Sequence, residues 1–395
     1  MEKLIPLSVP NFTGKELEYV TRAVETEWVS TGGRFIKEFE EKIAKYLKIK
    51  KAVACQSGTG ALHLALRLSG VGAEHEVIVP TLTFIAAVNP VKYQGAEPVF
   101  MDCDDTLNMD LDKLEGFFQK ECCLTKEGLI NKRTNKTIKA VVIVHIFGNM
   151  IDMERIMKIA RKYKLKVIED ATEALGSYCT TGEYSGKFAG TIGDFGAYSF
   201  NGNKIITTGG GGMLVAKDMV LVEKAKYLSA QAKDDPLYYI HDEIGYNYRM
   251  TNLQAALGIA QLEQLEELIE IKIKNYGLYE KEIQKIEGLD LLRFNKGTRS
   301  NYWFYSLMID KEKYGFNRDE LLKKLYQRNI QTRPIWGLIH EQKPYLKDQS
   351  YKVKRAKYYI ERVLNIPCST NLDKQDILTV INALKDFKSQ KERYS

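Results

Sequence analysis

Lys204 stands in an apolar, glycine-rich stretch, YSFNGNKIITTGGGGM at residues 198–213, where a free ammonium group would be poorly solvated. It follows a strand-like run that ends at Phe200 and precedes four glycines, Gly209 to Gly212. A buried lysine is costly unless it is paired or neutralised. One neutralising route is a covalent bond between its nitrogen and a carbonyl carbon, as in a Schiff base. The stretch therefore predicts a reactive lysine, and the glycines would let the backbone pass close to a bound group.

Other residues that could do chemistry follow the ends of predicted strands, where ligands of open parallel sheets gather. After the run KAVAC, Ser57, Gly58 and Thr59 lead into a helix whose N-terminal N–H groups could bind a phosphate. Taken alone, these three residues are better explained by a simple helix cap. After EVIVP comes Phe84, which a core position would also explain, and after Val167-Ile168 comes Asp170, which could be another cap.

The order of these parts favours the chemical interpretation. A site for pyridoxal phosphate needs a phosphate cradle, an aromatic ring that stacks on the cofactor, a carboxylate beside its ring nitrogen and a lysine that forms the imine. The cradle at Ser57, the ring of Phe84, the carboxylate of Asp170 and the amine of Lys204 follow one another in that order along the chain. The set predicts a pyridoxal phosphate site.

Seven short apolar runs, rich in valine and isoleucine, predict the strands that would position these residues. They alternate with helical patterns, and this alternation predicts an α/β fold with a mainly parallel sheet and helices on both faces. At the N-terminus, Thr13 and Glu16 predict a capping box that opens a helix, on which Leu17, Val20 and Val24 recur at helical spacing. The predicted strands are 51–55, 76–80, 97–102, 139–147, 166–170, 194–200 and 211–217.

Two units are expected. The first, residues 1–250, would be a large cofactor-binding domain that includes the N-terminal arm. The second, residues 251–395, would hold a long linking helix, which begins near Met250, and a small C-terminal domain with a strand near 302–310 and a helix near 317–329. The polar segment 119–139 predicts an irregular surface insertion.

Composition limits the function classes. The 395 residues carry a net charge of +7, which suits a solvated basic surface or a preference for anionic substrates, and the scattered lysines predict no nucleic-acid partner. The six cysteines form no C-x-x-C pair, so neither a disulfide framework nor a metal site is expected. The first residues lack an apolar signal core and no run of 18 apolar residues occurs, so we expect a cytoplasmic protein with no membrane partner.

Five ordered motifs carry a resemblance: SGTGALHLAL, PTLTFIAAVNPV, VIEDATEALGS, GDFGAYSFNGNKIITTGGGGM and GYNYRMTNLQAALGIAQLE. The chain resembles fold-type I aminotransferases of the DegT/StrS group, which act on nucleotide-linked keto-sugars. The stretches HDEIGYNYRM, RSNYWF and TRPIWGLIH, with the insertion ending NKRTNKTIK, resemble the branch that makes the 4-amino-sugar precursor of legionaminic acid or N-acetylbacillosamine. The resemblance implies the pyridoxal phosphate-dependent transferase fold of type I, with a mainly parallel seven-stranded sheet and a smaller C-terminal α/β lobe.

The resemblance also implies residue roles. Lys204 and Asp170 would be catalytic, as the Schiff-base lysine and the partner of the pyridine nitrogen. Glu173 would contact the phenolic oxygen of the cofactor, where many relatives have histidine or glutamine. Asn247 would reach the phosphate of a neighbouring subunit, which makes the expected active unit a homodimer with shared sites. The implied cofactor contacts are Ser57, Gly58, Thr59, Phe84, Asp170, Glu173, Ser199, Lys204 and Asn247.

Substrate contacts implied by the resemblance are Trp28, Ser30, Thr31, Asn201, Tyr302, Arg333 and His340. The guanidinium of Arg333 would suit a diphosphate because of its fork of donors. A surface ion pair explains Arg333 as well, and a loop position explains His340 as well.

The implied reaction has two halves. L-glutamate would give its amino group to the cofactor, which leaves pyridoxamine phosphate and 2-oxoglutarate. The amine would then pass to C4 of a UDP-2-acetamido-2,6-dideoxy-hexos-4-ulose, giving a 4-amino sugar for bacterial glycan biosynthesis. GDP-4-keto-6-deoxymannose or a 3-keto sugar would fit the same motifs. Two alternatives of another class share this scaffold. A sugar dehydratase would have histidine in place of Lys204, so the lysine argues against it. A non-catalytic regulator would need neither Lys204 nor Asp170, so the presence of both argues against that alternative.

Overall fold

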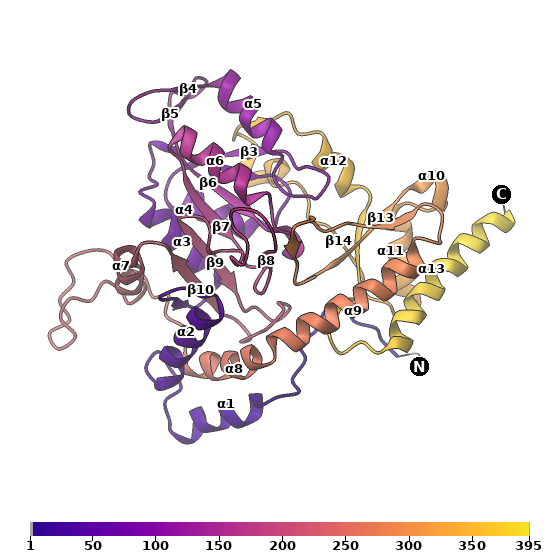
Figure 1. The fold of residues 1–395 in the computed structure, drawn as a ribbon, viewed down its shortest axis with the longest axis horizontal. Helices are drawn as coiled ribbons and strands as arrows, with labels where there is room; N and C mark the ends of the chain where they lie inside the picture. The colour runs from indigo at the N-terminus through magenta and orange to yellow at the C-terminus, as the bar shows by residue number, and fades with distance from the viewer. Residues whose placement is uncertain (1–2, 395) are drawn as a thin grey trace.

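The seven predicted strands are neighbours in one large sheet (Figure 1). This sheet has ten strands rather than the seven expected, because β15 (Ser350–Tyr351), β4 (Cys122–Leu124) and β5 (Leu129–Asn131) add to it. The computed structural model describes residues 3–394. Across the sheet the order is β1 (Val53–Cys55), β10 (Gly212–Ala216), β9 (Phe195–Ser199), β7 (Lys166–Asp170), β6 (Thr137–Val144), β2 (His75–Pro80) and β3 (Glu97–Met101). The last five are parallel, and β10 is antiparallel to both of its neighbours. The mainly parallel sheet predicted from the sequence is confirmed.

Helices cover both faces of this sheet, because alternate side chains of each strand enter different hydrophobic clusters. Val77 and Val79 of β2 pack with one set of helices, and Ile78 between them packs with the other. The first set is α3 (Gly58–Leu68), α4 (Asn89–Tyr93) and α7 (Met219–Ser229); the second is α2 (Arg34–Tyr46), α5 (Leu111–Glu121), α6 (Met153–Tyr163) and α8 (Asn252–Glu263).

The predicted irregular insertion is wrong for most of segment 119–139. Strands β4 (Cys122–Leu124) and β5 (Leu129–Asn131) form a hairpin, and β5 also pairs antiparallel with β6. The buried amide of Asn131 explains why a polar segment is ordered here, since its Nδ2 donates to Glu76 Oε2 at 2.8 Å. The hairpin therefore extends the large sheet.

The long helical pattern is confirmed as two helices, α8 and α9 (Leu265–Ile283), which run from the large sheet to the smaller lobe (Figure 1). That lobe has an antiparallel sheet in the order β11 (Leu289–Leu291), β13 (Tyr305–Ile309), β16 (Val363–Ile366) and β14 (Arg333–Pro334). The chain further contains β8 (Tyr178–Cys179), β12 (Thr298–Arg299), α10 (Lys311–Tyr314), α11 (Arg318–Gln327) and α13 (Lys374–Tyr394).

The division into residues 1–250 and 251–395 stays a prediction. Ile5 and Leu7 pack in the hydrophobic cluster of the smaller lobe, and the Ile5 N–H donates to the carbonyl of Asn329. This packing favours assigning the N-terminal arm to the smaller unit rather than to the larger one.

The first helix, α1 (Glu16–Glu25), begins later than the predicted capping box. Thr13 Oγ1 donates to Gln264 Oε1, and the carboxylate of Glu16 accepts hydrogen bonds from Gln261 and Gln264. Tertiary partners on α8 and just after it thus replace the local cap, and Thr13 as N-cap is wrong. Leu17 on this helix is 81% exposed.

A buried carboxylate joins the smaller lobe to the large sheet. Strand β15 (Ser350–Tyr351) pairs in parallel with β3, and Asp102, directly after β3, accepts the N–H groups of Lys354, Arg355 and Ala356 at the start of α12 (Arg355–Ile360). Lys113 is its ion-pair partner. Burial raises the pKa of Asp102, but the hydrogen bonds from Lys113 and from the three N–H groups outweigh this effect and hold the pKa below its ordinary value.

We expect Asp102→Ala to lower the free energy of unfolding by about 3 kcal/mol, because it removes the closest ion-pair partner of Lys113 and the acceptor of four backbone N–H groups, those of Cys103, Lys354, Arg355 and Ala356. Urea denaturation followed by circular dichroism measures this loss. The matched control is Asp112→Ala, which removes an exposed carboxylate paired with Arg155 and should cost less than about 1 kcal/mol. Equal losses in the two variants would contradict the role of Asp102.

Candidate active site

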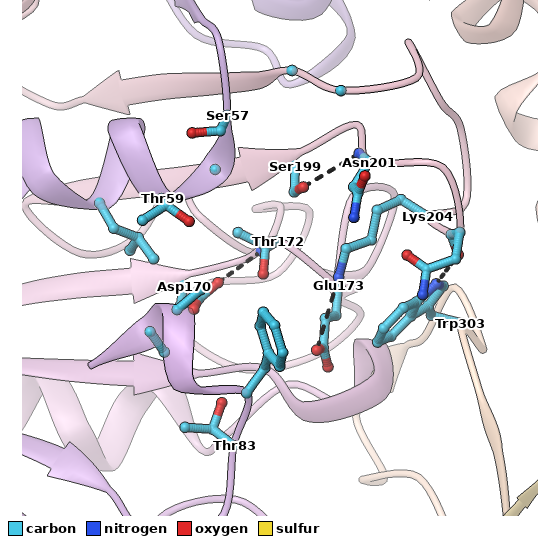
Figure 2. Close-up of a pocket in the computed structure, with 18 of the residues that line it drawn as sticks. Ser57, Thr59, Thr83, Asp170, Thr172, Glu173, Ser199, Asn201, Lys204 and Trp303 are labelled. Atoms are coloured by element: carbon cyan, nitrogen blue, oxygen red, sulfur yellow. Dashed lines mark hydrogen bonds and ion pairs between the residues drawn. The ribbon is translucent and has the colours of Figure 1, made fainter. Parts of the chain in front are cut away.

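A cavity of about 380 Å³ opens where the parallel strands end (Figure 2). Its walls come from the first turn of α3, the end of β7, the segment after β9 and the segments around residues 303 and 336 of the smaller lobe. Nine of the predicted site residues line it: Ser57, Gly58, Thr59, Phe84, Asp170, Glu173, Ser199, Asn201 and Lys204.

The start of α3 forms the cradle. Ser57 Oγ accepts the N–H of Gly60 as the helix cap, while a helix leaves its first N–H groups without intrahelical partners. No side chain fits at Gly58, where a Cβ would lie 2.9 Å from Thr172 Cγ2 and 3.0 Å from Ser199 Cβ. The hydroxyls and the helix N-terminus together suit a phosphate group.

Lys204 lies at the opposite side of this cavity and is largely buried, with a side chain that is 13% exposed. Its Nζ lies 3.9 Å from Glu173 Oε1 and 3.9 Å from the ring centroid of Trp303. Burial lowers the pKa of the Lys204 amine, and the carboxylates of Glu173 and Asp170 oppose this by less. A neutral amine of this kind can act as a nucleophile or accept a proton.

Asp170 ends β7 and is almost fully buried. Its Oδ1 accepts the N–H of Thr172 at 3.0 Å, which fixes the carboxyl group toward the cavity (Figure 2). Burial raises the pKa of Asp170, and the hydrogen bonds from Thr172 partly offset the rise. No cationic side chain of residues 3–394 forms an ion pair with Asp170, so this buried carboxyl is suited to bind a protonated ring nitrogen.

Glu173 presents one oxygen to the protein and the other to Lys204. Its Oε2 accepts the N–H of Phe147 at 2.7 Å, and Phe147 has a left-handed backbone with φ of 56°. Burial raises the pKa of Glu173 to about 7, and the Lys204 charge lowers it by less. Near neutral pH this carboxyl can therefore donate or accept a proton.

The sequence interpretation missed several lining residues. Trp303 falls in a strand-like aromatic run, which predicts a core position, and in the motif around Trp336 the sequence favours Arg333 and His340 as site residues. Thr83 and Thr172 are one and two residues from Phe84 and Asp170, so proximity along the chain was the available signal. The missed residues are Gln56, Leu62, Thr83, Ala86, Ala87, Thr172, Asn203, Trp303, Phe304 and Trp336, whereas Gly210 and Gly211, which also line the cavity, belong to the glycine run expected beside a bound group.

Seven predicted site residues lie outside this cavity: Trp28, Ser30, Thr31, Asn247, Tyr302, Arg333 and His340. Tyr302 packs against Phe294 and Tyr276, and His340 Nδ1 is hydrogen-bonded to the Thr81 hydroxyl, so local packing explains both side chains. Arg333 lies exposed on β14.

The remaining four lie near α1 or in the segment that follows α7. Asn252 holds the segment after α1 in place. Its side-chain amide accepts the N–H of Phe35 and donates to the carbonyl of Trp28, and its backbone N–H donates to the carbonyl of Ser30. Trp28 itself is 62% exposed. Asn247 is held by its backbone, which bridges to Ala230. None of these residues completes the cavity of its own chain.

Within residues 3–394 no helix is long and apolar enough to cross a membrane. In the same span, the His, Cys, Asp and Glu side chains form no group of three placed to hold a metal ion.

The residues present fit pyridoxal phosphate. The α3 cradle and the Ser199 hydroxyl suit its phosphate, Asp170 its ring nitrogen, and the Lys204 amine its aldehyde carbon. Glu173 adds a carboxyl whose raised pKa suits a hydrogen bond to an oxygen of the ring.

Comparison with known proteins gives the family. Residues 10–385 match the DegT/DnrJ/EryC1/StrS aminotransferase family. The chain is 40% identical to GDP-perosamine synthase of Caulobacter vibrioides over 96% of this chain and 97% of that protein. It is 30% identical to a UDP-4-amino-4,6-dideoxy-N-acetyl-beta-L-altrosamine transaminase of Campylobacter jejuni, over 96% of each.

The crystal structure of DesI with its TDP-sugar product superimposes with a TM-score of 0.87 and 26% identity, covering 100% of this chain and 95% of DesI. The predicted type I transferase fold is confirmed. The chain therefore belongs to the DegT/DnrJ/EryC1/StrS aminotransferase family, and it is a pyridoxal phosphate-dependent sugar aminotransferase.

Proposed function

We propose that Lys204, Asp170 and Glu173 transfer an amino group from L-glutamate to the C4 ketone of a nucleotide-linked 4-keto-6-deoxy sugar. The observation that carries the proposal is the placement of a largely buried amine and two buried carboxyls in one cavity with a helix N-terminus suited to phosphate. When bound, pyridoxal phosphate supplies the electron sink that makes the α-proton of an amine removable.

The residues of this chain would divide the work. Ser57, Thr59 and Ser199 would hold the phosphate, and Asp170 would keep the ring nitrogen protonated by its charge. Lys204, freed when an amine substrate takes its place, would take a proton from one carbon and return it to another as general base and acid. Glu173 is 3.9 Å from Lys204 and would stabilise the amine whenever it carries that proton.

Two nucleotide sugars are candidates. The motifs near Tyr302 and Arg333 support UDP-2-acetamido-2,6-dideoxy-hexos-4-ulose, and similarity to the Campylobacter transaminase at 30% agrees with a UDP-linked sugar. The higher identity to GDP-perosamine synthase, 40%, favours the alternative, GDP-4-keto-6-deoxymannose.

We further propose that two copies share their active sites. The segment after α7 projects from the body (Figure 1) and exposes five large apolar side chains: Leu237, Tyr238, Tyr239, Ile240 and Ile244. Exposed apolar patches of this kind mark protein contacts. A second copy covering this segment would bring Asn247, and with it Trp28, Ser30 and Thr31 near α1, toward a partner's cavity, where a two-fold interface repeats every contact.

Incubation with L-glutamate and each keto-sugar tests the reaction. We expect the wild-type protein to form a 4-amino sugar from one of the two nucleotide sugars, detected by mass spectrometry, together with 2-oxoglutarate. Borohydride should fix the cofactor on the peptide that contains Lys204. Lys204→Ala should form neither product and show no such adduct, and near-normal turnover by that variant would refute the assignment.

Asp170→Asn should still bind the cofactor but lose the charge that keeps the ring nitrogen protonated. We expect turnover to fall by roughly two orders of magnitude, equivalent to about 2.7 kcal/mol of barrier. Asp194→Asn is the matched control, because Asp194 also accepts a backbone N–H beside a strand, from Val167, but lies outside the cavity. A loss below about tenfold in Asp170→Asn would mean that Asp170 serves only its local hydrogen bonds.

A mixed dimer tests the shared site. If Asn247 serves the partner's phosphate site, a dimer of one Asn247→Ala chain and one Lys204→Ala chain has one site with both lesions and one with neither. Mixing the two impaired parents should then return activity, up to about half that of wild type for each mixed dimer. If Asn247 serves its own chain, every site keeps one lesion. No recovery despite verified subunit exchange would therefore contradict sharing.

A further inference from the structure

Trp303 lines the cavity beside Lys204, and the proposed amino transfer gives it no role. Its indole is buried, and the Lys204 ammonium nitrogen lies 3.9 Å from its ring centroid (Figure 2). Cations within about 6 Å of an indole face are attracted by the ring quadrupole, and tryptophan is the best of the aromatic side chains at this. The contact is therefore short enough to affect the protonation of Lys204.

Three groups hold the ring in this position. The indole Nε1–H donates to the carbonyl of Asn203 at 2.7 Å, one residue before Lys204. The backbone N–H of Trp303 donates to Asn301 Oδ1 at 3.0 Å, and its carbonyl accepts from the buried ammonium of Lys272 at 2.8 Å. A side chain tied at its ring and at its backbone keeps a fixed orientation.

The second face of the indole is covered. The ring of Phe304 stacks on Trp303 with centroids 4.1 Å apart and planes inclined by 16°. Trp336, another indole of the same cavity, packs against Phe84 and Phe147, and Phe147 also lies at the edge of contact with Trp303, with centroids 6.1 Å apart. Trp303 thus offers its remaining face to Lys204, whereas Trp336 has other ring partners.

We propose that the face of the Trp303 indole receives the Lys204 ammonium each time this lysine is free of the cofactor. The proposal rests on the proposed function, in which Lys204 must be released and must carry a proton for part of the cycle. The cavity is apolar enough to disfavour a charged amine, so a protonated Lys204 needs stabilising partners. Glu173 provides one at 3.9 Å on one side, with Asp170 further away, and Trp303 provides the other without accepting the proton.

Trp303 would thus stabilise the charge of the Lys204 ammonium without taking the proton from it. A carboxylate alone could stabilise the ammonium, but it could also take the proton from it. An aromatic face stabilises the charge and has no basic site, so the proton stays on Lys204 until the substrate carbon accepts it. Trp303 is a catalytic residue in this sense, because it touches the nitrogen that reacts.

The test measures the pKa of Lys204 in the cofactor-free protein, where amino transfer plays no part. The protein is labelled with a trace amount of an amine-acylating reagent at a series of pH values, and the extent of labelling on the Lys204 peptide is read by mass spectrometry. We expect the pKa of Lys204 to fall by about one unit in Trp303→Leu, which corresponds to about 1.4 kcal/mol. Trp303→Phe keeps a weaker aromatic face and should give a smaller fall.

Trp336→Leu is the matched control, because it removes an indole from the same cavity that makes no cation–π contact with Lys204 in the described part of the chain. Its Lys204 pKa should equal that of wild type. Circular dichroism establishes which variants are folded, and Trp303→Phe decides the question if Trp303→Leu does not fold. An unchanged or raised pKa in the folded Trp303 variant, or an equal fall in Trp336→Leu, would overturn the proposal.

The labelling experiment on Trp303 and the borohydride experiment on Lys204 can fail independently of each other. A protein that fails to bind pyridoxal phosphate on Lys204 would refute the proposed function in the borohydride experiment, whatever the labelling shows. A protein that transfers amino groups but whose Lys204 pKa ignores Trp303 would refute only the inference on Trp303.

Discussion

Three ionisable groups share one buried space, and the arrangement of the site depends on what that costs. An isolated charge on Lys204, Glu173 or Asp170 would be strongly disfavoured in this cavity, so burial lowers the pKa of the amine and raises that of each carboxyl. The charged forms of the amine and the carboxyls stabilise one another, because their charges are opposite. The three groups must therefore be held at fixed separations, and the segments around them serve that need: Thr172 fixes Asp170, and Phe147 fixes Glu173.

Both lobes contribute to this balance. Lys204 and Asp170 follow strands of the large sheet, whereas Trp303 precedes a strand of the smaller one and is tied to α9 through Lys272. Asn301, two residues earlier, donates to the carbonyls of Glu173 and Leu175. The site is thus a joint product of two hydrophobic cores, and the contacts between the lobes set the distances that decide protonation.

The sequence predicted the parts of the fold that local pattern determines. Strands that are buried on both faces are continuous apolar runs, whether parallel or, like β1 and β10, antiparallel, so the sequence predicts all seven. The lysine and the strand-end aspartate could be predicted from chemistry that is rare elsewhere. Prediction failed where a distant partner overrides a local signal. Thr13 resembles a helix cap but bonds to Gln264, and segment 119–139 looks irregular but is ordered by Asn131 against Glu76. Trp303 could not be chosen from its neighbours, because the groups that orient it lie up to about a hundred residues away along the chain. Whether Asn247 serves its own chain or another is likewise not encoded in a single sequence pattern.

The pairing of β15 with β3, together with the hydrogen bonds at Asp102, has a consequence for biosynthesis. Strand β3 is made early, but its outer edge is covered by residues 349 to 351, and Asp102 obtains three of its backbone partners from residues 354 to 356. While the chain emerges from the ribosome, more than 240 residues must follow before this edge is covered and this carboxylate is satisfied. Nascent chains therefore carry an open strand edge for most of their synthesis, which is the condition in which sheets pair with the wrong partner. The last quarter of the sequence thus acts as the closing step of a sheet that the first half lays down.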